Sequence, residues 1–131
     1  MKIGFLIKDL SFGGAERATV SLANYFALHS QDVEIITFKG SESFYPLEEL
    51  VTVYTADLGE LEQSASLKRL FGSIKRIFRI RKIVKSQQLD VLIGMSFAMT
   101  WYTVLATMFT KTKSVGTERS NPYRYKATKL N

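Results

Sequence analysis

Hydrophobic positions in this chain fall into short apolar stretches and longer segments with helical spacing. The short stretches are predicted as strands, at Lys2–Ile7, Asp32–Phe38, Val51–Asp57, Asp90–Ser96 and Lys113–Glu118. The longer segments are predicted as helices, at Ala15–Ala27, Ser66–Ser86 and Phe97–Phe109. Strands that alternate with helices indicate βαβ units and a parallel sheet. We therefore expect an α/β fold, a Rossmann-like open parallel sheet with helices on both faces, which binds its ligands at the carboxyl ends of the strands.

One segment also fits a different interpretation. Val91–Phe109 carries no charged residue and approaches the length of a membrane-spanning helix. It contains Gly94, Ser96 and several threonines, and it divides into a strand and a helix within the βαβ pattern. The pattern therefore favours an α/β fold over a membrane span.

Composition limits the class of protein further. The chain has 131 residues, 46% of them hydrophobic, which suits one globular domain. It has no cysteine and a single histidine, His29, so a disulfide framework and a cysteine-based metal site are excluded. The sequence shows no carboxylate cluster, and we expect neither a metal nor a cofactor. Lys8 and Asp9 follow the first apolar run too soon for a signal peptide.

Two adjacent glycines, Gly13 and Gly14, separate the first predicted strand from the first predicted helix. Glycines here allow close backbone approach, and the helix N-terminus favours an anion such as a phosphate. The pair could equally serve only to turn the chain. The stretch "SFGGAER" matches neither G-x-G-x-x-G nor G-x-x-x-x-G-K-[ST], and Phe38 and Lys39 stand where a dinucleotide-binding fold places an acid. NAD binding and nucleotide hydrolysis are both disfavoured.

The net charge of +6 comes from one predicted helix. Its basic residues are Lys68, Arg69, Lys75, Arg76, Arg79, Arg81, Lys82 and Lys85. The rest of the chain has ten basic and twelve acidic residues, so its net charge is −2. Such a helix could lie on an anionic membrane, or pack on the core with a solvated charged face. No nucleic acid is expected as a partner, because the aromatic residues lie on the apolar face and no nucleic-acid motif is present.

The stretch "FGGAERATVSLANYFALHSQDVEIITF" and the later "GTERSNP" resemble the N-terminal half of GT-B fold glycosyltransferases. The resemblance is to the large retaining family of bacterial polysaccharide and lipopolysaccharide sugar transferases, and it covers nearly the whole chain. Such enzymes have two Rossmann-like domains. The N-terminal domain handles the acceptor, and the C-terminal domain binds the nucleotide-sugar.

The resemblance implies roles for individual residues. The loop that is implied to face the donor phosphates and the transferred sugar contains Gly13, Gly14, Glu16 and Arg17. Glu16 and Arg17 could instead only complement the helix dipole and form a surface arm. Glu118 is the implied catalytic position, where many relatives carry a histidine close to the reacting sugar. The residues implied for the acceptor side or the cleft are Arg119, Ser120 and Asn121. Two further acceptor contacts are predicted from the pattern itself: Ser96, which ends the fourth predicted strand, and Tyr45, in an exposed loop over the same edge of the sheet. Trp101 and Tyr102 could line an acceptor pocket, but we predict them as core residues.

The resemblance also implies what lies outside the chain. Residues 1–131 would form one N-terminal domain, and the C-terminal nucleotide-sugar-binding domain would be absent, so the chain alone would be inactive. Its co-substrates would be a nucleotide-sugar donor and a saccharide or lipid-linked acceptor. No protein nucleophile is expected, and the lack of a D-x-D triplet fits metal-independent transfer. The protein would be cytoplasmic, with the basic helix attaching it to the inner face of the cell membrane. The alternative is a stand-alone, non-enzymatic domain that binds anionic membrane or polyanions through this helix.

Overall fold

The computed structural model of the chain describes residues 1–40, 42–57 and 66–119. Its strands are β1 (Lys2–Ile7), β2 (Asp32–Thr37), β3 (Val51–Thr55), β4 (Val91–Gly94) and β5 (Lys113–Gly116). Its helices are α1 (Gly14–Leu28), α2 (Ser66–Ser86) and α3 (Phe97–Thr107). Every predicted element is present. The last four strands end one or two residues earlier than predicted, because the chain leaves the sheet there to form the loops at its carboxyl edge.

The five strands form one parallel sheet in the order β3-β2-β1-β4-β5. Leu6 of β1 lies opposite Ile36 of β2 and Gly94 of β4. The chain moves outward from β1 in one direction to β3, then returns to the other side of β1 through α2. The order therefore reverses between β1 and β4, and the carboxyl ends of these two strands flank the crevice where such sheets bind ligands.

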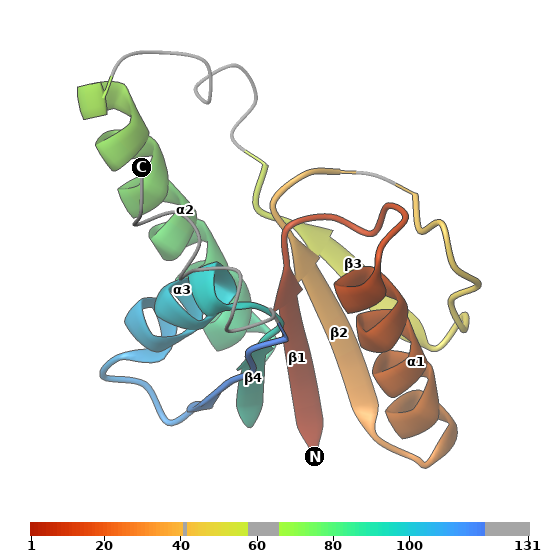
Figure 1. The fold of residues 1–131 in the computed structure, drawn as a ribbon. Coiled ribbons are helices and arrows are strands. Elements are labelled where there is room, and N and C mark those ends of the chain that lie inside the picture. The colour runs from red at the N-terminus through yellow and green to blue at the C-terminus, as the bar shows by residue number, and fades with distance from the viewer. Residues whose placement is uncertain (41, 58–65, 120–131) are drawn as a thin grey trace.

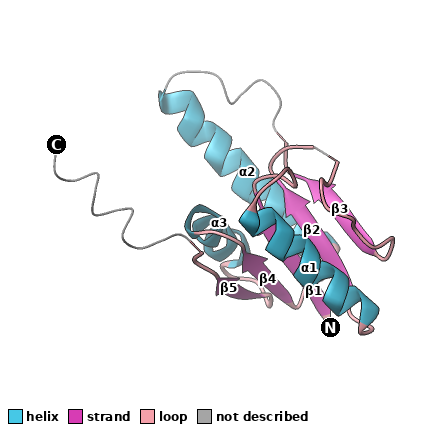
Figure 2. Cartoon of the chain, turned by 45° about the vertical axis from the view of Figure 1, so that its right-hand side comes forward, coloured by secondary structure: helices cyan, strands magenta, loops and turns pink. Residues whose placement is uncertain are grey.

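Helices cover both faces of the sheet, as predicted. Figures 1 and 2 show α1 on one face and α2 with α3 on the other. Alternate residues of β1 serve the two layers. Phe5 packs in the cluster that includes Val20 and Ala23 of α1, whereas Leu6 packs in the cluster that includes Ile80 and Met99 of α2 and α3.

Two glycines let α3 approach the sheet closely. A Cβ atom on Gly94 would lie 2.7 Å from the backbone nitrogen of Thr100 and 2.8 Å from the carbonyl carbon of Met99. A Cβ on Gly116 would overlap the side chain of Thr100. The backbones of β4 and α3 thus pack directly on each other, which holds the start of α3 over the carboxyl edge.

The prediction that Trp101 belongs to the core is wrong. Its side chain is 59% exposed on α3 and meets Phe97 edge to face at 6.2 Å. Tyr102 is half-buried as part of the α2–α3 interface, where its hydroxyl donates to Ser73 Oγ at 3.1 Å. The prediction rested on how often aromatic side chains are buried, which could not say which face of α3 meets the sheet.

Candidate functional site

A pocket of about 760 Å³ lies at the carboxyl edge of the sheet, where the strand order reverses. Its lining residues come from the starts of α1 and α3, from the end of β4 and from the chain after β5: Gly14, Ala15, Met95, Ser96, Phe97, Ala98, Glu118 and Arg119. Segments far apart in the sequence meet here because parallel strands bring their carboxyl ends to one edge. The pocket therefore occupies the position that the fold assigns to a ligand.

Two helix N-termini meet at this pocket. Helix α1 begins at Gly14 after Gly13, and among the described residues no side chain caps that terminus by a hydrogen bond. Helix α3 begins at Phe97, and Ser96 Oγ accepts a hydrogen bond from the backbone N–H of Met99 at 3.3 Å. The first-turn amides and the positive ends of both helix dipoles favour negative charge in the space between them.

The side chain of Glu16 folds back over the backbone of the glycine loop. The Glu16 carboxylate occupies the space that a Cβ on Gly13 would need. Arg17 is exposed, and its backbone N–H donates to the carbonyl of Gly13 at 3.0 Å in the first turn of α1. Earlier in the loop, hydrogen bonds from the Ser11 side chain and backbone hold the pKa of the Asp9 carboxyl below its usual range. Asp9 thus stays ionised and fixes the turn that precedes the glycines.

The segment after β5 contributes the charged wall of the pocket. Thr117 donates twice to the carbonyl of Gly94, through its backbone N–H at 3.0 Å and its Oγ1 at 2.9 Å. These bonds direct the following residues, Glu118 and Arg119, to the pocket. The expected cleft residues Ser120 and Asn121 lie outside the described residues.

The structure adds residues to the site that the sequence did not single out. Met95 is fully buried beneath the pocket, and its backbone N–H donates to the carbonyl of Leu6 at 3.0 Å, which ties β4 to β1. In the sequence, nothing distinguished Thr117 from any other threonine at the end of a strand. Its role depends on the register between β4 and β5, which no sequence pattern specified.

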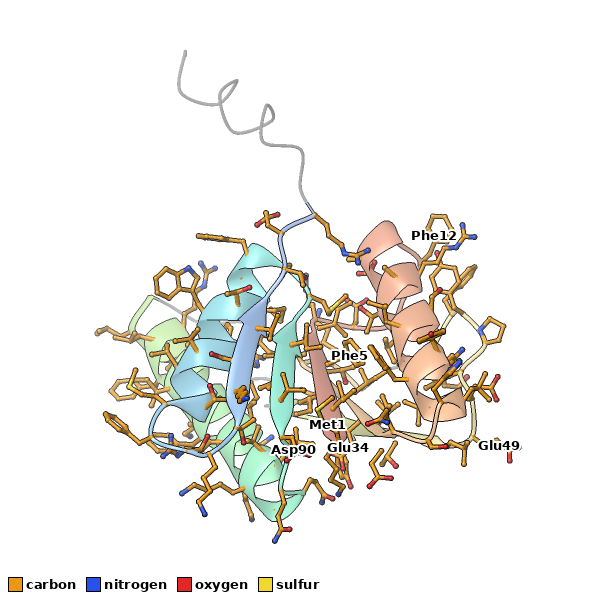
Figure 3. All side chains as sticks on the ribbon, turned by 90° about the horizontal axis from the view of Figure 1, so that it is seen from below. Met1, Phe5, Phe12, Glu34, Glu49 and Asp90 are labelled. Atoms are coloured by element: carbon orange, nitrogen blue, oxygen red, sulfur yellow. The ribbon has the colours of Figure 1, made fainter. Side chains whose placement is uncertain are left out.

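Tyr45 lies away from the pocket lining, against the outer side of the glycine loop. Its hydroxyl donates to the carbonyl of Gly13 at 3.1 Å and accepts from the N–H of Gly13 at 3.4 Å. Its ring packs with those of Phe12 and Phe44, at centroid distances of 6.4 Å and 5.1 Å. Figure 3 shows Phe12 beside the first turn of α1.

The arrangement suits an anionic ligand. It offers backbone amides from two helices, one guanidinium group at Arg119 and a hydroxyl at Ser96. Within residues 1–40, 42–57 and 66–119, no three histidine or carboxylate side chains gather in a group that could hold a metal ion.

Some basic residues of α2 make contacts inside the fold, and the others face solvent. Arg76 is only 7% exposed and its guanidinium lies 4.2 Å from the centroid of the Phe38 ring. Arg81 is half-buried and its Nη1 donates to the carbonyls of Ala106 and Met108 at the end of α3. The basic residues of α2 that face solvent are Lys68, Arg69, Lys75, Arg79, Lys82 and Lys85.

Helix α2 also exposes apolar side chains. They are Leu67, Leu70, Phe71, Ile74 and Phe78. Figure 1 shows that α2 extends beyond the carboxyl edge of the sheet, so its first turns have no strand beneath them. In the described part of the chain, no helix is both long enough and apolar enough to cross a membrane.

Comparison with known proteins agrees with this architecture. The sequence model of Glycosyltransferase Family 4 matches residues 12–130. A Campylobacter jejuni protein, GalNAc-α-(1→4)-GalNAc-α-(1→3)-diNAcBac-PP-undecaprenol α-1,4-N-acetyl-D-galactosaminyltransferase, is 36% identical over 92% of this chain and 33% of its own length. An uncharacterised glycosyltransferase of Haemophilus influenzae is 34% identical over 80% of this chain and 28% of its own. The chain thus spans about a third of the length of these relatives.

A solved structure shares the fold. Sucrose-phosphate synthase of Thermosynechococcus elongatus superposes with a TM-score of 0.75 at 12% identity, over 95% of this chain and 35% of that one.

Proposed function

The chain belongs to glycosyltransferase family 4, and on that premise we propose that the natural protein transfers a sugar from a nucleotide-sugar to a saccharide or lipid-linked acceptor. The product would serve cell-surface polysaccharide synthesis. In this proposal the chain is the N-terminal, acceptor-side domain of a GT-B enzyme, and a C-terminal domain outside it binds the nucleotide. The observation that carries the proposal is the meeting of two helix N-termini and the glycine loop at one pocket.

The glycine loop supplies the donor side of this pocket. When the sugar leaves, negative charge develops on the diphosphate, and fixed amide dipoles stabilise that charge without reorganising. Gly14 presents no side chain at the pocket, so a phosphate can approach the backbone. Glu16 and Arg17 flank the loop, and Arg119 adds a full positive charge from the opposite wall.

The other wall supplies the acceptor side. Ser96 can donate its hydroxyl hydrogen to a sugar oxygen while its Oγ accepts from the amide of Met99. Glu118 is proposed to contact the reacting sugar, and Ser120 and Asn121 are proposed to contact the acceptor. No protein nucleophile is needed, because the donor phosphate itself helps to deprotonate the acceptor hydroxyl.

Substitutions at Gly14 test the site. A Cβ there meets no atom within 4 Å, so Gly14→Ala and Gly14→Asp should both fold. In the natural protein, Gly14→Asp should reduce transfer from a nucleotide-sugar about a hundredfold or more by repelling the phosphates, and Gly14→Ala less. Gly40→Ala is the matched control, because its Cβ also meets nothing within 4 Å and it lies outside the pocket lining. Equal rates for Gly14→Asp and Gly40→Ala would contradict a donor role for this pocket.

The proposed transfer needs no metal or other cofactor. The absence of a D-x-D triplet supports this. Excess EDTA should leave the transfer rate of the natural protein unchanged. A loss of rate that Mg²⁺ or Mn²⁺ restores would show that a metal takes part.

We also propose that the protein attaches to the inner face of the cell membrane through α2. The exposed apolar residues of α2 lie beside its exposed lysines and arginines, which suits a surface that offers acyl chains and anionic headgroups. Each Lys or Arg near such a surface contributes about 1 kcal/mol. Arg76 and Arg81 are left out of this surface, because the structure uses them inside the fold.

Vesicle flotation tests the attachment. Changing Lys75, Arg79 and Lys82 to Gln should weaken binding to phosphatidylglycerol vesicles about tenfold or more. The control changes Lys39, Lys111 and Lys113, which are also exposed but do not belong to α2, and should leave binding nearly unchanged. Equal losses in the two triple variants would show that net charge, rather than α2, governs binding.

A further inference from the structure

The loop after β2 is fastened both to the β1–α1 connection and to α1 itself. The backbone N–H of Phe44 donates to the carbonyl of Leu10 at 2.9 Å, just before the glycines. Asn24 of α1 donates from Nδ2 to the carbonyl of Pro46 at 2.9 Å and accepts at Oδ1 from the N–H of Glu48, also at 2.9 Å. These contacts hold the loop at a fixed place against α1.

Tyr45 sits between these fastenings and reaches the glycine loop. Its hydroxyl pairs with both the N–H and the carbonyl of Gly13, and Ser43 Oγ donates to the carbonyl of Tyr45 at 2.7 Å. The ring is held from the side by Phe12 and Phe44. The tyrosine is thus fixed at its backbone, its ring and its hydroxyl.

Gly13 is the residue whose orientation most affects the pocket. It precedes the first helical residue of α1, it has an extended backbone (φ 170°, ψ 168°), and its side chain cannot cap the helix. A glycine in a loop has more accessible backbone conformations than any other residue. A rotation at Gly13 would turn the following amides, those of Gly14 and Ala15, away from the pocket that these residues line.

We propose that Tyr45 is a positioning residue that holds Gly13 extended and thereby aims the first amides of α1 at the ligand. This inference rests on the proposed function, and it assigns Tyr45 to the donor loop instead of the acceptor contact that the sequence suggested. Hydrogen-bond donors stabilise a transition state most when they are already oriented before the charge develops. Loosening the glycine loop should therefore lower the rate of transfer more than the affinity for the substrates.

Tyr45→Phe in the natural protein tests the proposal, because it removes the hydroxyl and keeps the ring. Amide hydrogen exchange should rise several-fold in the peptide that contains Gly13 and Gly14 and stay unchanged in β1. The kcat for transfer should fall about tenfold, on the scale of a neutral hydrogen bond, because the variant removes both bonds of the hydroxyl to Gly13, with the acceptor KM within about twofold of wild type. Tyr25→Phe is the matched control, since Tyr25 lies on the exposed side of α1 with its ring stacked on His29 at 4.1 Å, and it should change none of these values.

Each outcome decides the proposal. Unchanged exchange in the glycine peptide, or a loosened loop with an unchanged kcat, would overturn it. A raised acceptor KM with wild-type kcat would place Tyr45 on the acceptor instead. If the wild-type protein transfers no sugar from any nucleotide-sugar, the proposed function fails, and the exchange comparison between Tyr45→Phe and Tyr25→Phe still decides whether the hydroxyl holds the loop.

Discussion

Glu34 of β2 is a buried carboxylate whose surroundings satisfy it only in part. Its side chain is 5% exposed, it pairs with Lys2 Nζ at 3.5 Å, and its Oε2 has no hydrogen-bond partner among the described residues. Figure 3 shows it near Met1 and Asp90, at the end of the sheet opposite Phe12. Burial raises the pKa of Glu34, the Lys2 ammonium opposes that rise, and nearby Asp32 adds a little to it.

This raised pKa makes the fold less stable as pH increases. Between the unfolded and folded pKa values the folded state binds more protons, so stability falls as pH rises through that window, which lies above 4.5. Glu34→Gln, which stays neutral, should therefore raise the unfolding midpoint at pH 7 by a few degrees, corresponding to about 1 kcal/mol. The gain should shrink toward pH 4, and thermal unfolding of the natural protein at both values measures it. A gain of equal size at both pH values would point to packing rather than charge.

Single residues also show where sequence reasoning stops. The pocket residues Gly14, Ser96, Glu118 and Arg119 could be placed at one edge of the sheet, because each ends or follows a predicted strand. The contact between Tyr45 and Gly13 could not, because it depends on how the loop after β2 folds back across α1.

At the scale of elements, α3 depends on its contact with β4. The backbone atoms of Thr100 and Met99 already occupy the position of a Cβ on Gly94. Gly94→Ala must push α3 off the sheet, and overpacking of this kind costs about 1–3 kcal/mol. Thermal unfolding of the natural protein should show a clear loss for Gly94→Ala and almost none for Gly40→Ala. Similar midpoints for both would mean that α3 can shift without cost.

The far end of α3 depends on α2. Arg81 donates to the carbonyls of Ala106 and Met108, where a positive charge complements the helix C-terminus. Arg81→Gln should destabilise the protein by about 1 kcal/mol. Lys82→Gln removes the same charge from the exposed neighbouring position and should leave the unfolding midpoint within about a degree. The prediction fails if the two variants unfold at the same temperature.

Element boundaries followed well from the sequence, whereas the surroundings of each element did not. The predicted range Ser66–Ser86 matches α2 at both ends. Its periodicity showed an apolar stripe, but a stripe does not reveal whether a partner covers it. The first turns of α2 extend beyond the sheet, a property of helix length relative to strand length. Phe78 is exposed although Ile77 and Ile80 beside it pack in the core, because it lies on the other face of the helix.

At the scale of the whole molecule, protection should decrease from the middle of the sheet outward. Strand β1 lies at the centre, with Phe5 and Leu6 fully buried on its two faces, whereas all of β5 is exposed at one edge. Hydrogen exchange in the natural protein should be slower in β1 than in β5 by about a hundredfold or more. Equal protection in both strands would show that another part of the natural protein covers the β5 edge.

The two walls of the pocket differ in stiffness. On one side, β4 and α3 touch backbone to backbone at Gly94, and Thr117 ties the following segment to the same strand. On the other side, the glycine loop is held by individual hydrogen bonds, among them those of the Tyr45 hydroxyl to Gly13 and of the Phe44 N–H to Leu10. The wall formed by β4 and α3 is therefore the stiffer one, and the glycine loop is the wall that can adjust to a ligand. Differences in ligand size must be absorbed by the glycine loop, so variants that broaden the range of accepted donors should arise in that loop and in Tyr45, and not in the α3 wall.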